Sequence, residues 1–180
     1  MKINNYAEDL AYSDSVSDKV NLFTRSKLSQ FYNIDNIISV QEKHLQFAGV
    51  DKIVKTIDGK IIRIEEKIRR VTRNDILIEL LANTDQYLKH PRGLGWGLKA
   101  YSTDILLYYF EDSNTGWFFH WAKFQKTLIK NLPVWFDLAK NNKNGFMFKY
   151  AYNKGYKSKN IVIPKNVFLN AYVNEGGVII

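Results

Sequence analysis

The spacing of apolar residues along the first third of the chain predicts helices followed by a β-hairpin. Residues 5–12 and 16–32 have helical character. Residues 45–57 and 60–69 are predicted to be two strands around Asp58-Gly59, a dipeptide typical of tight hairpin turns. The apolar stripe of the second helical segment would consist of Val20, Phe23, Leu28 and Phe31.

Beyond the hairpin, the pattern predicts two more strands, a helix and an aromatic, lysine-rich tail. Residues 75–80 favour a third strand, 83–97 a polar loop and 103–110 a largely buried fourth strand. Residues 146–173 favour a short strand and a helix around Pro164. Helical spacing and bulk also predict the core stripe of a helix at Trp117, Trp121, Phe124 and Leu128.

This order of elements predicts a mixed α/β (α+β) fold with a central mixed sheet flanked by helices. No repeat, low-complexity tract or linker divides the 180 residues, so we expect one domain, 1–180. Its core would span about residues 16–130, and residues 146–180 would form a basic and aromatic C-terminal extension.

Charge adds a preference for polyanionic partners. The chain has 26 Lys and Arg against 18 Asp and Glu, a formal charge of +8, and basic side chains release counterions from nucleic-acid phosphates. The absence of cysteine excludes disulfides, thiolate zinc sites and cysteine nucleophiles. Because residues 1–10 lack the apolar run of a secretion signal and no stretch resembles a membrane span, we expect a cytoplasmic protein without a membrane partner.

The residues best suited to chemistry lie in the predicted hairpin. Side chains alternate between the two faces of a strand, so Glu65 and Lys67 share a face with Ile61 and Arg63, while Ile62, Ile64 and Ile68 share the other. Asp51, on the preceding strand, would add a second carboxylate. Magnesium prefers oxygen ligands, usually one or two carboxylates, and a neighbouring lysine can position or deprotonate an attacking water.

The register of the hairpin decides whether these groups meet. If Asp58-Gly59 is a two-residue turn, Asp51 lies opposite Glu66. If residues 57–59 form a three-residue loop with a bulge at Gly59, Thr56 pairs with Lys60. Asp51 then lies opposite Glu65, on the face of Lys67. We predict the second register, or a bulge further along.

Five segments carry a resemblance to a known family. They are QFAGVDK at 46–52, IEEK at 64–67, NDILIE at 74–79, GWGLK at 95–99 and TDILLY at 103–108. Together they resemble the core of the PD-(D/E)XK nuclease superfamily, in a phage-type, restriction-endonuclease-like branch. One departure is Val50, which stands where the superfamily usually has a proline before the first acid.

The resemblance implies a restriction-endonuclease-like core and a magnesium- or manganese-dependent endonuclease that hydrolyses phosphodiester bonds in DNA. Its catalytic residues would be Asp51, Glu65 and Lys67, and the metal would be held by both carboxylates and the backbone carbonyl of Glu66. Glu79 and Glu8 are implied as auxiliary acids.

Each signal also has a structural interpretation. Asp58-Gly59-Lys60 satisfies the same acidic-x-Lys pattern inside a turn, and Glu65 with Lys67 would suit a surface ion pair. We expect Asp104 to take part in a structural hydrogen bond. Two basic groups are candidates for contacts with nucleic acid or are simply solvated: Arg69, Arg70 and Arg73, and the tyrosine-interleaved Lys154, Lys157 and Lys159.

Three functions remain open at this level. The first is the metal-dependent DNA endonuclease, for which a homodimer would suit two cuts in a duplex. The second is a catalytically inactive nucleic-acid-binding protein with a nuclease-like fold. The third is a protein-interaction module that uses the aromatic C-terminal half.

Overall fold

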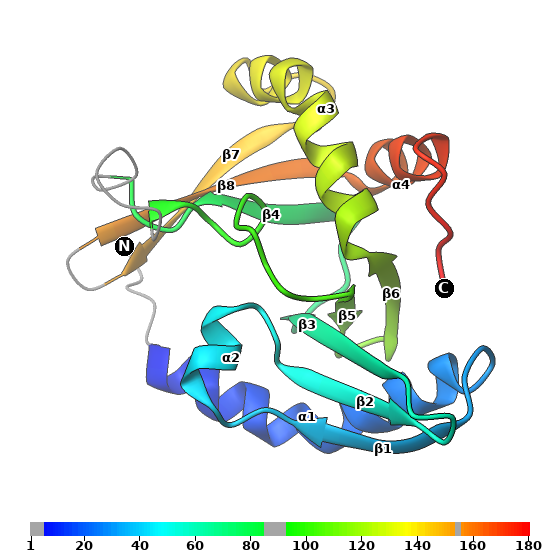
Figure 1. The fold of residues 1–180 in the computed structure, drawn as a ribbon. Coiled ribbons are helices and arrows are strands. Elements are labelled where there is room, and N and C mark those ends of the chain that lie inside the picture. Colours follow the sequence, from blue (N-terminus) through cyan, green and yellow to red (C-terminus); the bar gives the residue numbers. More distant parts are fainter. Residues whose placement is uncertain (1–5, 85–92, 154–155) are drawn as a thin grey trace. The chain divides into compact units, whose positions relative to one another are not determined.

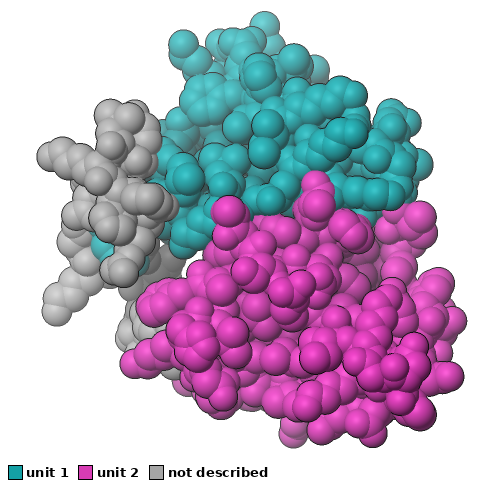
Figure 2. All heavy atoms as spheres, in the orientation of Figure 1, with its two compact units in different colours: residues 1–6, 73–99, 123–177 teal, residues 7–72, 100–122, 178–180 magenta. Residues whose placement is uncertain are grey.

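A computed structural model describes residues 6–84, 93–153 and 156–180, without the side chains of residues 6–10, 13 and 153. Its internal contacts divide the chain into two compact units (Figure 2). Unit 1 comprises residues 1–6, 73–99 and 123–177, and unit 2 comprises residues 7–72, 100–122 and 178–180.

Unit 2 contains a five-stranded sheet in the order β1-β2-β3-β5-β6 (Figure 1). β3 and β5 are parallel and the other neighbours are antiparallel, so the sheet is mixed, as predicted. The strands are β1 (Ile34–Ser39), β2 (Lys52–Thr56), β3 (Ile61–Arg69), β5 (Ile105–Phe110) and β6 (Thr115–His120).

The helix α1 (Tyr6–Leu28) supplies the apolar cover for one face of this sheet. Val20, Phe23 and Leu28 are buried in one cluster with strand residues such as Val54, as the sequence predicts. The helix is continuous where the sequence predicts two segments. It ends at Leu28, so Phe31 lies beyond it and is exposed, and its assignment to the stripe was wrong.

The first predicted strand was wrong in its first half. Residues Lys43–Phe47 form the short helix α2, and β2 begins only at Lys52. Between them Gly49 has a φ of +75°, a left-handed conformation that glycine adopts without a Cβ penalty and that ends the helical turn. β1, which pairs with β2, was not predicted.

The centre of the sheet follows the sequence pattern more closely. Every residue of β5 is buried, as expected for a continuous apolar run between two neighbouring strands. Trp117 was wrongly placed on a helix. It lies on β6 opposite Tyr108, and α3 (Trp121–Lys140) begins only where the pairing with β5 ends.

Unit 1 contains a second, antiparallel sheet in the order β4-β8-β7. α4 and the part of α3 from Lys123 onwards lie on one face of it (Figure 1), where the Phe124 and Phe168 ring centroids are 4.9 Å apart. The strand predicted at 75–80 is therefore present, but in a different sheet from the hairpin. The remaining elements are β4 (Asp75–Leu81), β7 (Met147–Asn153), β8 (Tyr156–Pro164) and α4 (Lys165–Asn174).

Within the described residues, no helix combines the length and apolarity needed to cross a membrane.

Candidate active site

The hairpin adopts the register with the three-residue loop. Lys52 pairs with Ile64, and the Thr56 N–H donates to the carbonyl of Lys60 over 3.0 Å. The loop is therefore residues 57–59, and Gly59 has the left-handed φ of +83° that the predicted bulge requires. This prediction is confirmed.

Asp51 is held against β3 by two hydrogen bonds. Its N–H donates over 2.8 Å to the carbonyl of Ile64, which is also the partner of Lys52, so the pairing shifts by one residue at Asp51. Its Oδ2 accepts from the N–H of Glu66 over 2.7 Å. The carboxylate thus reaches across the strand at the peptide that joins Glu65 to Glu66.

Glu65 is a buried acid beside a second carboxyl group. Its side chain is only 4% exposed and forms an ion pair with Lys67. Burial, opposed by Lys67 and reinforced by Asp51, raises the pKa of Glu65 to about 7. A cation bound by both carboxylates would offset the burial of the Glu65 charge and its repulsion by Asp51.

Lys67 supplies positive charge on the same face. Burial alone would lower the pKa of its ammonium, but Glu65, Asp51 and Tyr101 outweigh this effect and the net shift is upward. Lys67 is therefore protonated at neutral pH beside the two acids. In this state it offers a fixed cation and hydrogen-bond donor rather than a base.

Lys52 and Glu66 form a second ion pair, which was not predicted. They lie on the other face of the hairpin, with Nζ 2.9 Å from Oε1 and side-chain exposures of 3% and 10%. Burial raises the pKa of Glu66, an effect opposed by Lys52. The sequence contained a signal for Lys52. In the predicted register Lys52 lies opposite Ile64, so it shares the core face of the hairpin.

Tyr101 was not predicted from the sequence either. A Cβ at Gly49 would overlap its ring, so this glycine allows the tyrosine to pack beside the turn that leads to Asp51. The ring centroid of Tyr101 lies 5.5 Å from that of Trp121. No local pattern links residues 49 and 101, so only the fold brings them together.

The donor set fits a magnesium ion. Among the described residues, no three or more His, Cys, Asp or Glu side chains gather as a metal centre. Magnesium commonly uses only one or two carboxylates, completed by water and substrate oxygens. Asp51 and Glu65 meet that requirement, and the Glu66 carbonyl follows Glu65 on β3.

Asp104 has the structural role expected of it. Its carboxylate accepts two hydrogen bonds from the Arg63 guanidinium and one from the Arg63 N–H, at 2.8–2.9 Å. Burial would raise the pKa of Asp104, but Arg63 holds it below its usual value. This pair fixes the start of β5 against β3.

The two predicted auxiliary acids lie on elements other than β2 and β3. Glu79 lies on β4 in the three-stranded sheet of unit 1, where the Trp96 N–H approaches its Oε2 at 3.4 Å. Glu8 lies on α1, but its side chain falls outside the described residues.

The three arginines at the end of β3 and beyond it make different contacts. Arg69 donates to the Tyr108 hydroxyl over 2.8 Å, and the Arg70 guanidinium lies 4.1 Å from the Tyr12 ring centroid. Arg73 is exposed and belongs to unit 1. The first two are therefore held by contacts within unit 2.

The lysines of the tail contact aromatic rings. Lys157 Nζ lies 5.4 Å from the Tyr150 ring centroid, and Lys159 Nζ lies 3.8 Å from that of Phe148. Lys154 lies outside the described residues. The predicted interleaving of aromatic and basic side chains is thus present in space for the two lysines that are described.

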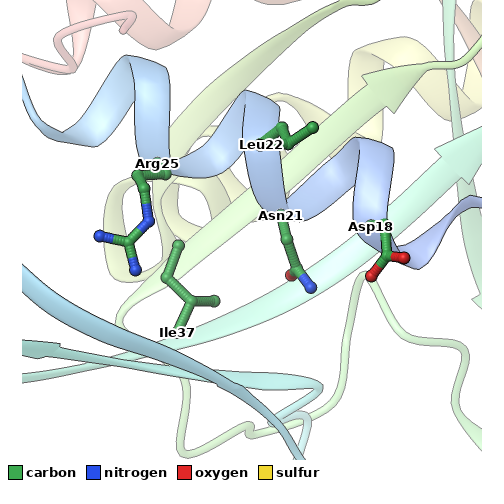
Figure 3. Close-up of a pocket in the computed structure, with 5 residues that line it drawn as sticks. All are labelled: Asp18, Asn21, Leu22, Arg25 and Ile37. Carbon is green, nitrogen blue, oxygen red and sulfur yellow. The ribbon is translucent and has the colours of Figure 1, made fainter.

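Unit 2 also has a depression of about 290 Å³ between α1 and β1 (Figure 3). Asp18 and Arg25 on the helix give it charges of both signs, and it includes no residue of the Asp51, Glu65 and Lys67 group. The remaining lining residues are Asn21, Leu22 and Ile37.

Comparisons with family models, curated proteins and solved structures found no match.

Proposed function

We propose that this protein is a magnesium-dependent nuclease that hydrolyses phosphodiester bonds in DNA. The observation that carries the proposal is the bulged hairpin register, which brings Asp51, Glu65 and Lys67 together on one face of the sheet. The family resemblance of the same residues supports it, and so does the charge of +8.

Asp51, Glu65 and the Glu66 carbonyl would hold the metal. When bound, magnesium polarises a phosphoryl oxygen and favours formation of hydroxide from water. The Glu66 N–H orients the Asp51 carboxylate, and the rigid pairing of β2 with β3 fixes the separation of the two acids.

Lys67 acts on the substrate side of the same site. Its ammonium offsets the negative charge that accumulates on the phosphate, and it donates a hydrogen bond that orients a water molecule. Glu65 pairs with this ammonium, so a metal held by the Glu65 carboxylate would leave Lys67 available to the phosphate.

The test is cleavage of plasmid and oligonucleotide DNA with magnesium or manganese. We expect Glu65→Gln and Lys67→Ala each to lower the cleavage rate by about 100-fold or more, the scale of losing one positioned catalytic group. The second acidic-x-Lys triplet in the hairpin supplies the matched controls. Asp58→Asn and Lys60→Ala alter exposed residues in and next to the turn and should cleave like the wild type. Cleavage that survives both Glu65→Gln and Lys67→Ala would refute the proposal.

One observation favours a second candidate, a nucleic-acid-binding protein that does not cut. Glu65 and Lys67 neutralise each other directly, as they would in a site that never binds metal. This candidate predicts a salt-sensitive band shift that Asp51→Ala leaves unchanged, with no cleavage under either metal.

A further inference from the structure

The net positive charge of the chain comes from one of its two units. By sequence, unit 1 contains 15 Lys and Arg against 5 Asp and Glu, whereas unit 2, which holds Asp51, Glu65 and Lys67, contains 11 against 13. Residues 138–174 contribute seven lysines and no acid. The electrostatic attraction for a polyanion therefore arises in unit 1.

Part of this charge is arranged on one face of the β7–β8 hairpin. Alternation places Phe148, Tyr150 and Tyr152 on the same face of β7, and the register pairs Tyr150 with Lys159 and Tyr152 with Lys157. We call these five residues the aromatic–lysine face. Side chains two apart on a strand are roughly 7 Å apart, so the rings form a row along β7 and the two ammonium groups lie beside it on β8.

The contacts in this face leave its charge uncompensated. Lys159 Nζ lies 3.8 Å from the Phe148 ring centroid and 4.4 Å from that of Phe136 on α3. Among the described residues no carboxylate forms an ion pair with Lys159 or Lys157, and burial lowers the pKa of Lys159. Contact with aromatic rings stabilises a cation without neutralising it.

The face also presents aromatic surface. Tyr150 is 45% exposed, although it lies in the middle of a paired strand. A tyrosine ring beside lysines can stack on a base while the lysines contact phosphates, but in a paired duplex the base faces are already covered by their neighbours.

We propose that the aromatic–lysine face binds an unpaired strand of nucleic acid by stacking of its bases on the tyrosine rings. The inference rests on the proposed function in taking nucleic acid as the substrate, and it adds that the substrate has a single-stranded part. The lysines bind phosphates without regard to sequence, so the face recognises unpaired structure and no particular base order.

Fluorescence polarisation of the full chain with EDTA present tests this inference without cleavage. The probes are a labelled 20-nucleotide single-stranded DNA, RNA of the same sequence, and the blunt DNA duplex. Tyr150→Ala should weaken binding of the single strands at least about fivefold, the lower range for loss of one stacked base, and change duplex binding less than twofold. The DNA and RNA arms show which strand is preferred.

The hairpin provides matched controls on its other face. Tyr156 is 43% exposed and Lys149 is exposed, but alternation directs both away from the aromatic–lysine face. Tyr156→Ala should bind single strands like the wild type. Lys157→Ala should lower the slope of log affinity against log salt by about 1, and Lys149→Ala should leave this slope unchanged.

Equal losses for Tyr150→Ala and Tyr156→Ala, or equal losses on single strands and duplex, would overturn the inference. Binding of heparin as tightly as single-stranded DNA, independent of Tyr150, would show simple polyanion attraction and also overturn it. If Tyr150→Ala lowers the melting temperature, Tyr150→Leu and Tyr150→Phe replace it. Single-strand binding should then be weaker for Tyr150→Leu, which lacks a ring, than for Tyr150→Phe, which keeps one.

Cleavage assays on the same variants separate this inference from the nuclease proposal. Lys67-dependent cleavage without Tyr150-dependent binding would reject the inference alone. Tyr150-dependent binding without cleavage would reject the nuclease alone.

Discussion

At the scale of single residues, Glu66 connects the two faces of the hairpin. Its N–H donates to Asp51, its carbonyl is the proposed third metal ligand, and its side chain pairs with Lys52 on the buried face. A buried ion pair adds little net stability compared with an apolar pair, but removal of one partner leaves an uncompensated charge. The pair therefore makes the structure sensitive to single substitutions at Lys52.

We expect Lys52→Met to lower the free energy of unfolding by about 3 kcal/mol, because Glu66 then loses its only described ion-pair partner in a buried position. Denaturant titration measures the change. Lys55→Met, which alters an exposed lysine of the same strand, should cost less than about 0.5 kcal/mol.

The double variant Lys52→Met with Glu66→Leu removes both charges and should recover most of the loss. Equal effects of Lys52→Met and Lys55→Met would show that the Lys52–Glu66 pair is unimportant for stability.

At the scale of elements, two glycines with positive φ set the ends of β2 for different reasons. Gly59, φ +83°, faces open space in the hairpin loop, whereas Gly49, φ +75°, packs against the ring of Tyr101. The first glycine is needed for backbone conformation alone. The second is needed both for conformation and for space.

Gly59→Ala should therefore destabilise the protein by about 1 kcal/mol, the cost of placing a Cβ in the left-handed region. Gly49→Ala should cost at least about 2 kcal/mol, because overlap with Tyr101 adds to that strain. Chemical denaturation of both variants measures the difference. Equal losses would mean that the Tyr101 ring moves aside freely.

β3 and Trp117 show where side-chain spacing predicts the structure correctly and where it does not. Alternation correctly predicted exposed and buried side chains from Ile61 to Ile64, because burial there follows the pleat of one strand, but Glu65 on the same face as Ile61 is buried. Trp117 was misassigned because a spacing of four residues to Trp121 fits a helix, while pairing with Tyr108 on β5 decided in favour of a strand. Pairing with a distant strand is not visible in a short window.

At the scale of the whole molecule, the net positive charge and the proposed catalytic residues belong to different units. Unit 2 contains the Asp51, Glu65 and Lys67 group with an excess of two acids, and unit 1 contains an excess of ten basic residues. A nuclease with this division would obtain its affinity for DNA mainly from unit 1.

Pairs of exposed lysines in the two units test this division. Lys140→Gln with Lys143→Gln should weaken DNA binding severalfold and lower the slope of log affinity against log salt by up to about 2. Lys55→Gln with Lys60→Gln makes the same change in net charge within unit 2 and should have little effect on either quantity. Polarisation at several salt concentrations provides the measurement, and equal slopes for the two pairs would contradict it.

The sequence by itself determined the features that depend on neighbouring residues. The buried run of β5, the loop at residues 57–59 and the shared face of Glu65 and Lys67 follow from side-chain alternation and from glycine's access to positive φ. These constraints act within a few residues, so they could be predicted without the fold.

Only the tertiary structure decided which distant segments pair. It assigned β4 and Glu79 to a second sheet, paired Lys52 with Glu66 beneath the hairpin, and packed Tyr101 on Gly49. Each outcome depends on burial and strand pairing between residues remote in sequence or on opposite strands, where many partners satisfy the same local pattern. The competition among those partners is resolved only when the whole chain packs.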